Sequence, residues 1–161
     1  MNGAVGALMW LAGHVAGWWL WRRLPRFRAN SEPDRAPVSV VVPVRDEEHN
    51  IAACVAALHA RAHDEVIVVD DGSTDGTRAL LEPLLAEAGS RVRYIYQPNG
   101  GLAAARNAGL AAARGEFVAF QDSDDAWLPW KLEAQVALMR RLPELAVIWT
   151  DMRAVDERGV E

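Results

Sequence analysis

The chain has 161 residues, a formal net charge of −5 and one cysteine, and its length is that of roughly one domain. The lone cysteine, Cys54, excludes an internal disulfide framework and a cysteine-ligated zinc site. Residues 1–37 hold five arginines against two acidic residues, whereas the other 124 residues hold 12 basic and 20 acidic side chains. An acidic body lacks the basic face that phosphate contacts require, which argues against nucleic acid as a partner.

Residues 1–22 are predicted to form an apolar helix that anchors the chain in a membrane or lies in its interface. Within it, residues 3–21 carry no formal charge, and a helix of this length nearly crosses a hydrocarbon layer of roughly 30 Å. Tryptophans at positions 18, 19 and 21 precede four arginines at positions 22–28, which is the order expected of an aromatic belt followed by a cytosolic basic flank. We therefore expect membrane association with a cytoplasmic body, while packing of this helix on lipid or on a partner without crossing stays open.

The segment 23–37 holds three prolines and is predicted to be a linker. From residue 38 onward, short β-rich runs alternate with helical patterns, which indicates βαβ units on a mainly parallel sheet. Strands are expected at 38–43, 65–70, 91–96, 116–120 and 145–150, and helices at 46–59, after 76, at 101–114 and at 129–141. Pro83 is expected to kink or divide the second of these helices. Residues 38–161 thus form one α/β domain.

Acidic segments follow three of the predicted strands, at residues 43–48, 70–75 and 121–125. In open α/β sheets, ligands bind beyond the carboxyl ends of the strands, so these segments should converge on one crevice. Asp122, Asp124 and Asp125 would repel one another at a strand end without a cation. Carboxylates completed by phosphate oxygens are typical of Mg²⁺ or Mn²⁺ sites, whereas a solvated loop that caps the next helix is the alternative.

Five blocks of sequence carry a resemblance to a known family. They are VSVVVPVRDE at 38–47, VVDDGSTD at 68–75, NGGLAAARN at 99–107, GEFVAFQDSDD at 115–125 and WLPWKLE at 127–133. In order and spacing they resemble the family 2 glycosyltransferases, over roughly residues 38–158. The resemblance implies the Rossmann-like GT-A fold and a metal-dependent transfer of sugar from a nucleoside diphosphate sugar to an acceptor hydroxyl. Inversion of the anomeric carbon is the family expectation.

The resemblance also assigns residues to the nucleoside part of the donor. It implies that Pro43 and Glu47 lie along the base and ribose, and that Asp71 accepts a hydrogen bond from the base imide, which favours uracil or thymine. Gly72, beside it, allows close approach of the backbone. Residues 44–46 read Val-Arg-Asp where the family often has Thr-Tyr-Asn, which puts aromatic contact with the base in doubt.

Further along the chain the resemblance assigns the diphosphate and metal contacts. It implies that Asp122 faces the ribose, that Asp124 binds the metal bridging the diphosphate, with Asp122 as the other acid of the motif, and that Asp125 supports them. Arg106 would open onto the same crevice, or would be a structural ion-pair partner of these acids.

The catalytic base has no convincing residue in this sequence. In the family, the base and the acceptor site belong to a half that follows the fifth strand, so the chain resembles a donor-binding half truncated before the acceptor half. Asp151 is a weak candidate, since the match places it where the chain leaves the donor half. Acceptors of the saccharide or lipid-linked class are expected.

Other classes of protein fit the sequence less well. A sugar-1-phosphate nucleotidylyltransferase needs a glycine-rich basic first loop where residues 43–47 stand, and a haloacid-dehalogenase-type phosphatase needs Asp-x-Asp after its first strand. A membrane-tethered fragment that binds nucleotide sugar without turnover remains the alternative function.

Overall fold

The computed structural model describes residues 37–60, 65–152 and 154. The chain divides into two compact units, Met1–Pro33 and Asp34–Glu161, and the described residues all belong to the second. The helix expected over residues 1–22 and, apart from Pro37, the linker expected over residues 23–37 lie outside the described residues. Within the described part, no helix is both long enough and apolar enough to cross a membrane.

Four parallel strands form the sheet, in the spatial order β3-β2-β1-β4. The strands span Val38–Val44 (β1), Glu65–Asp71 (β2), Val92–Gln97 (β3) and Phe117–Phe120 (β4). The central strand β1 pairs with β2 and β4, so that Val40 lies opposite Val66 on one side and Ala119 on the other. Because parallel neighbours need crossover connections, the helices between successive strands follow from this topology. The expected α/β class with a mainly parallel sheet is confirmed.

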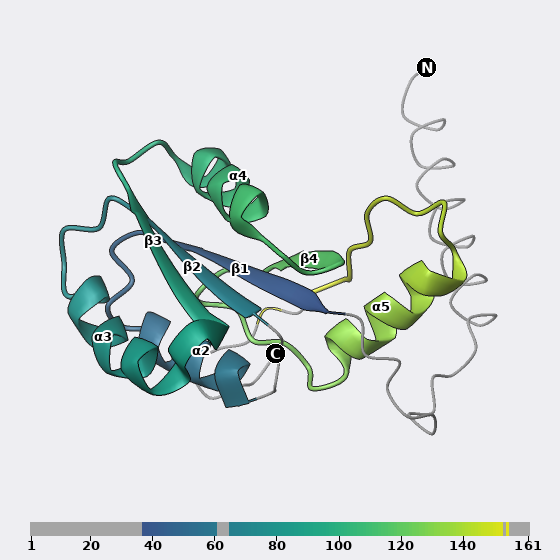
Figure 1. The fold of residues 1–161 in the computed structure, drawn as a ribbon, viewed down its shortest axis with the longest axis horizontal. Helices are drawn as coiled ribbons and strands as arrows, with labels where there is room; N and C mark the ends of the chain where they lie inside the picture. The colour runs from purple at the N-terminus through teal and green to yellow at the C-terminus, as the bar shows by residue number, and fades with distance from the viewer. Residues whose placement is uncertain (1–36, 61–64, 153, 155–161) are drawn as a thin grey trace, which may run out of the picture. The chain divides into compact units, whose positions relative to one another are not determined.

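Helices cover both faces of the sheet (Figure 1). α2 (Ile51–Ala60) and α3 (Thr77–Ala88) lie on one face, and α4 (Leu102–Ala112) lies on the other. The short 3-10 helix η1 (Gly89–Arg91) leads into β3, and α5 (Lys131–Arg141) follows β4. A parallel sheet needs both faces buried, and this layering provides that burial.

Side chains of β1 alternate between two apolar clusters. Val40 and Val42 pack with Ile51 of α2 on one face of the sheet, whereas Val41 packs with Ala105 of α4 on the other. These side chains are all fully or almost fully buried. The unbroken run of valines is therefore the pattern of a strand that is buried on both faces.

α4 approaches β1 closely because it is built from small residues. A Cβ at Gly109 would collide with the side chain of Val41. Overpacking of this kind typically costs about 1–3 kcal/mol, so the glycine sets how near α4 lies to the sheet. This matters for the site, because α4 carries Arg106.

A buried polar network closes the amino-terminal edge of the sheet. Glu65 accepts the Ser39 hydroxyl at 2.7 Å, the backbone N–H of Arg114 at 3.1 Å and the Arg93 guanidinium at 2.6 Å. Arg93 also donates to the carbonyl oxygen of Ala112 at 2.8 Å. Burial raises the pKa of Glu65, but the hydrogen bonds from Ser39, Arg93 and Arg114 outweigh it and hold the pKa below its usual value. The network fixes the path of the chain from α4 into β4.

Two helix predictions need correction. The first helix begins at Ile51 rather than at residue 46, because Asp46 has a φ of 54°, which a right-handed helix excludes. Pro83 does not divide the second helix, which runs through it from Thr77 to Ala88. A proline inside a helix costs about 3 kcal/mol, and burial of Leu81 and of the partly buried Leu84 beside it offsets a similar amount.

The strand predicted at residues 145–150 is absent from the sheet among the described residues. This segment has no ladder partner, and Val147 and Trp149 are 69% and 83% exposed. Apolar and β-branched residues favour a strand only where a neighbouring strand offers backbone groups to pair with. The composition of this segment was therefore insufficient evidence for a strand.

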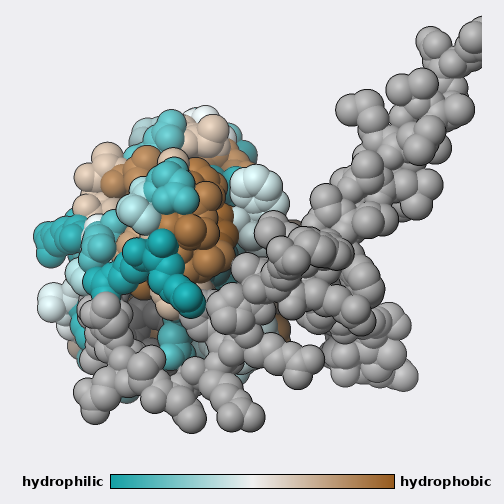
Figure 2. Space-filling view, turned by 90° about the vertical axis from the view of Figure 1, so that its right-hand side faces the viewer, coloured by the Kyte–Doolittle hydropathy of each residue, from teal (hydrophilic) through white to brown (hydrophobic). Residues whose placement is uncertain are grey.

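Hydrophobic residues gather at the surface on the side of β4 and α5, which faces the viewer in Figure 2. The exposed large hydrophobic residues of β4 and of the segments before and after α5 are Phe120, Leu128, Trp130, Leu142, Val147, Trp149 and Met152. Apolar side chains in such numbers on one part of a chain are more typical of an interface than of a free surface.

Candidate functional site

The functional residues lie where three neighbouring strands end at the same edge of the sheet. β1 pairs in parallel with β2 and β4, so the loops after Val44, Asp71 and Phe120 leave the sheet side by side. The order β3-β2-β1-β4 places the reversal of strand order between β1 and β4, and ligands of open α/β sheets bind at such a switch point. The structure thus brings the predicted acidic segments to a common edge.

The loop after β1 and the loop after β2 are hydrogen-bonded to each other. The backbone N–H groups of Asp46 and Glu47 donate to the hydroxyls of Ser73 and Thr77, each at 2.9 Å. In the other direction, the N–H of Thr74 donates to the Asp46 carboxylate at 2.7 Å. These two loops form one wall of the site. Glu47 is half-buried there, whereas Pro43 is buried within β1, opposite Val69.

Asp71 ends β2 and holds the loop that leads into α4. Its carboxylate accepts the Gln97 amide at 2.6 Å, the N–H of Gly100 at 2.8 Å and the N–H of Gly101 at 2.7 Å. The Gly100 N–H is the largest cause of a lowered pKa at Asp71, and together these donors outweigh the effect of burial. A carboxylate has about four acceptor positions, and these donors occupy three of them.

Gly72 is required by the backbone at this point. Its φ is +80°, and a Cβ there would lie 2.8 Å from the backbone nitrogen of Asn99. A side chain would therefore be strained and would push away the loop that Asp71 holds. The immediate neighbour of Gly72 in the structure is Asn99, in the segment between β3 and α4.

Arg106 of α4 forms an ion pair with Asp122 after β4, with 2.9 Å between Nη2 and Oδ1. Its guanidinium also lies over the Phe120 ring, 5.9 Å from the centroid. The structure therefore shows the structural ion-pair partner that the sequence offered as one of two possibilities for Arg106. The pair engages one oxygen of Asp122, and within the described part of the chain no hydrogen bond or ion pair engages the other.

A tight turn presents the remaining acids. The Asp125 N–H donates to the Asp122 carbonyl at 3.2 Å, and the Gln121 amide donates to the Asp125 carbonyl at 2.5 Å. Ser123 is buried within this turn, whereas Asp124 is exposed. Among the residues that the structure describes, no hydrogen bond or ion pair engages the Asp124 carboxylate.

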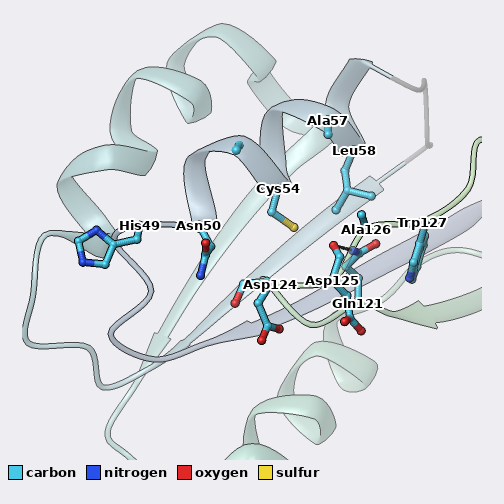
Figure 3. Close-up of a pocket in the computed structure, with 12 residues that line it drawn as sticks. His49, Asn50, Cys54, Ala57, Leu58, Gln121, Asp124, Asp125, Ala126 and Trp127 are labelled. Atoms are coloured by element: carbon cyan, nitrogen blue, oxygen red, sulfur yellow. Dashed lines mark hydrogen bonds between the residues drawn. The ribbon is translucent and has the colours of Figure 1, made fainter. Parts of the chain in front are cut away.

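A pocket of about 300 Å³ lies between α2 and this turn (Figure 3). Its lining residues are His49, Asn50, Ala53, Cys54, Ala57, Leu58, Gln121, Ser123, Asp124, Asp125, Ala126 and Trp127. Burial, followed by the charges of Asp124, Asp125 and Glu47, raises the pKa of the Cys54 thiol from its ordinary value of 9.0 to about 11. The pocket is thus lined by apolar residues of α2 on one side and by Asp124 and Asp125 of the turn on the other.

The residues present fit a divalent metal of the Mg²⁺ or Mn²⁺ class. These ions take oxygen ligands and are usually held by one or two carboxylates together with substrate phosphates. Asp124 and the unpaired oxygen of Asp122 offer that donor set. Within the described part of the chain, no group of three or more histidine, cysteine, aspartate or glutamate side chains could enclose a metal.

Sequence reasoning missed two contacts at this edge. Cys54 lines the pocket together with Gln121 of the predicted segment 121–125, but Cys54 stands in no motif, and only the packing of α2 against the turn reveals it. Asn50 was also overlooked, and its amide donates to Glu47 at 3.0 Å. Asp151 is exposed and accepts the N–H of Met152 at 3.0 Å; within the described residues it makes no contact with the acidic turn.

The fold and site define a Rossmann-like α/β domain whose ligand edge carries acidic loops. The chain belongs to the family 2 glycosyltransferases, because the family model "Glycosyl transferase family 2" matches residues 39–159. This confirms the family indicated by the five sequence blocks.

Individual proteins show how far the similarity extends. The chain is 37% identical over 105 residues to the uncharacterized glycosyltransferase alr2836 of Nostoc, covering 64% of this chain and 33% of that protein. It is 38% identical over 105 residues to the Escherichia coli UDP-Glc:alpha-D-GlcNAc-diphosphoundecaprenol beta-1,3-glucosyltransferase WfgD, covering 63% and 40% respectively.

A solved structure is similar over more of the chain. The mannosyltransferase PcManGT from Pyrobaculum calidifontis, in complex with GDP-Man and Mn²⁺, matches with a TM-score of 0.62 and 28% identity. The match covers 84% of this chain and 42% of that protein. The chain thus spans less than half the length of each of these three proteins, and the GT-A fold expected from the sequence is supported.

The Cys54 thiol provides a test of the pocket. Thiolate is the reactive form, and a pKa of about 11 instead of 9.0 lowers its fraction at pH 8 about 100-fold. Iodoacetamide should therefore alkylate the native chain about 100-fold more slowly than the urea-unfolded chain at pH 8. Since Cys54 is the single cysteine, mass spectrometry of the whole chain gives the rate. Equal rates in the two states would contradict the half-buried, acid-flanked environment of Cys54.

Proposed function

We propose that this domain binds a nucleoside diphosphate sugar at the carboxyl edge of its sheet and serves its transfer to an acceptor hydroxyl, with inversion. The observation that carries the proposal is the set of acidic loops at the β1–β4 switch point, within residues matched by the family 2 glycosyltransferase model. The printed names of similar proteins support it, since WfgD takes UDP-Glc and PcManGT is bound to GDP-Man.

The nucleoside is proposed to lie against the wall formed by the loops after β1 and β2. Glu47 is half-buried in this wall and Asp71 keeps one acceptor position for the imide N–H of a base. Uracil and thymine carry such an N–H, so UDP and dTDP are the favoured nucleotides. Pro43 is buried in β1, where it pairs with Val69 of β2, just before the loop that forms the wall.

The diphosphate is proposed to lie beside the turn after β4. Asp124 would hold Mg²⁺ or Mn²⁺ there, with Asp122 as second ligand and Asp125 in support. The metal, when bound, supplies neutralisation of the negative charge on the nucleoside diphosphate leaving group. Arg106 would orient Asp122 through its ion pair.

The acceptor is proposed to be a saccharide or a lipid-linked saccharide. WfgD is similar to this chain, and its name gives a diphosphoundecaprenol-linked acceptor. A carboxylate base must take the proton of the attacking hydroxyl, and Asp151 remains the weak candidate for that role. A base outside residues 38–161 is the favoured arrangement, because the matches cover less than half of each similar protein.

Calorimetry with UDP and Mn²⁺ tests the donor site. UDP should bind the wild-type chain in Mn²⁺, and Asp124→Asn should weaken that binding about ten-fold or more, because it removes a charged metal ligand. Glu144→Gln is the matched control, since Glu144 is an exposed acid outside the site, and it should bind UDP as the wild type does. Full UDP affinity in the presence of EDTA would refute the metal role.

A turnover assay separates transfer from binding alone. A positioned base typically contributes about 10²- to 10⁴-fold in rate, and no residue described here supplies it convincingly. The 161-residue chain should therefore bind UDP but transfer sugar poorly from UDP-sugars to saccharide or lipid-linked acceptors. Robust metal-dependent transfer would show that the base lies within the chain, and the membrane-tethered binding fragment without turnover would then be excluded.

The domain is proposed to work at the cytoplasmic face of a membrane. The support is the uncharged stretch at residues 3–21, with its tryptophans and the arginines that follow. Deletion of residues 2–21 should release the body into the soluble fraction of a cell lysate, while the full chain should sediment with membranes. A full-length chain found wholly in the soluble fraction would overturn this placement.

A further inference from the structure

The wall of the proposed donor site is held together by hydrogen bonds that run in both directions between two loops, at residues 45–50 and 72–77. Besides the bonds of Asp46 and Glu47 described above, the Glu48 N–H donates to Asp75 at 3.2 Å. The Gly76 N–H in turn donates to the Glu48 carboxylate at 2.8 Å. Each loop thus satisfies backbone donors of the other, and neither loop is held by its own side chains alone.

Asp46, like Glu48, engages the opposite loop through both its backbone and its side chain. Its N–H donates to Ser73, while its Oδ1 accepts the Thr74 N–H at 2.7 Å and the Thr74 hydroxyl at 3.3 Å. Among the described residues it is also the one non-glycine residue with positive φ, at 54°. Aspartate and asparagine tolerate this left-handed conformation better than other side chains do.

Asp46 stands between the residues to which nucleoside contacts were assigned. Glu47 follows it directly in the chain, and its partners Ser73 and Thr74 follow Asp71 and Gly72. Release of the Asp46 carboxylate would therefore loosen both sides of the wall at once. The turn after β4, which carries Asp124, has no hydrogen bond to Asp46 within the described part of the chain.

We propose that Asp46 is a positioning residue for the nucleoside half of the donor, acting through the loops at residues 45–50 and 72–77. It fixes Glu47 and Asp71 relative to each other by its left-handed backbone and its bonds to Thr74. This inference rests on the proposed function, and it assigns to Asp46 no contact with the nucleotide itself.

Three substitutions at Asp46 separate the backbone from the carboxylate. Asp46→Asn keeps an acceptor oxygen and tolerates positive φ. Asp46→Gly tolerates the backbone but removes the acceptor. Asp46→Ala removes the acceptor and disfavours the backbone. For UDP in Mn²⁺, calorimetry on the full chain should give affinity within two-fold of wild type for Asp46→Asn, a loss of about three- to ten-fold for Asp46→Gly and a loss of more than about ten-fold for Asp46→Ala.

Pyrophosphate serves as the second probe, because it lacks the nucleoside. Its affinity in Mn²⁺ should stay at the wild-type value in all three variants, whereas general unfolding would weaken both probes. Glu87→Ala, an exposed acid on α3, is the control and should change neither affinity. Parallel losses of UDP and pyrophosphate affinity, or an Asp46→Asn variant as weak as Asp46→Ala, would overturn the positioning role.

Hydrogen–deuterium exchange tests the interlock without any nucleotide. Peptides covering residues 72–77 should exchange faster in Asp46→Ala than in the wild type and Asp46→Asn, while peptides of β1 should not change. Unchanged exchange of residues 72–77 in Asp46→Ala would refute the inference. If the wild type fails to bind UDP but the exchange result holds, the donor assignment fails while the structural interlock stands.

Discussion

The parallel pairing of β1 with both β2 and β4 is the constraint on which the rest of the structure depends. The pairing covers both edges of β1 while helices cover its two faces, which suits its valine-rich sequence. The same pairing makes three strands end at one edge, where the loops that leave the sheet carry acidic side chains. The concentration of acids at that edge is therefore a consequence of the sheet, and α4 can approach it closely because Gly109 leaves room for Val41.

The acids at this edge divide into two groups according to their partners. Asp46 and Asp71 receive hydrogen bonds from the backbones of neighbouring loops, so their charge is used to hold the chain. Asp124 is exposed and has no such partner among the described residues, and Asp122 is half-engaged by Arg106. A cation is stabilised most by carboxylates whose charge is not already used by another partner. Asp122 and Asp124 are therefore better candidates than Asp46 and Asp71 for binding a metal and a diphosphate. The first group shapes the wall beside this site.

Much of the fold could be predicted, because local patterns are strong where burial is complete. The four strands and the helices between them lie within a few residues of their predicted positions. The predicted secondary structure is wrong where tertiary contacts override the local sequence pattern. α3 continues through Pro83 because Leu81 is buried and Leu84 is partly buried. α2 starts late because Asp46 takes a left-handed conformation, and among the described residues the segment 145–150 has no neighbouring strand to pair with.

The sequence by itself determined the class of the domain, its family and the segments that form its ligand edge, because hydrophobic period and ordered motifs are properties of the chain alone. Only the tertiary structure decided what each acid does. It showed that Asp71 anchors the loop before α4, that Arg106 pairs with Asp122, and that Cys54 faces the acidic turn. These contacts join residues 16 to 71 positions apart, and their geometry depends on how α2 and α4 pack on opposite faces of the sheet, which no local pattern encodes.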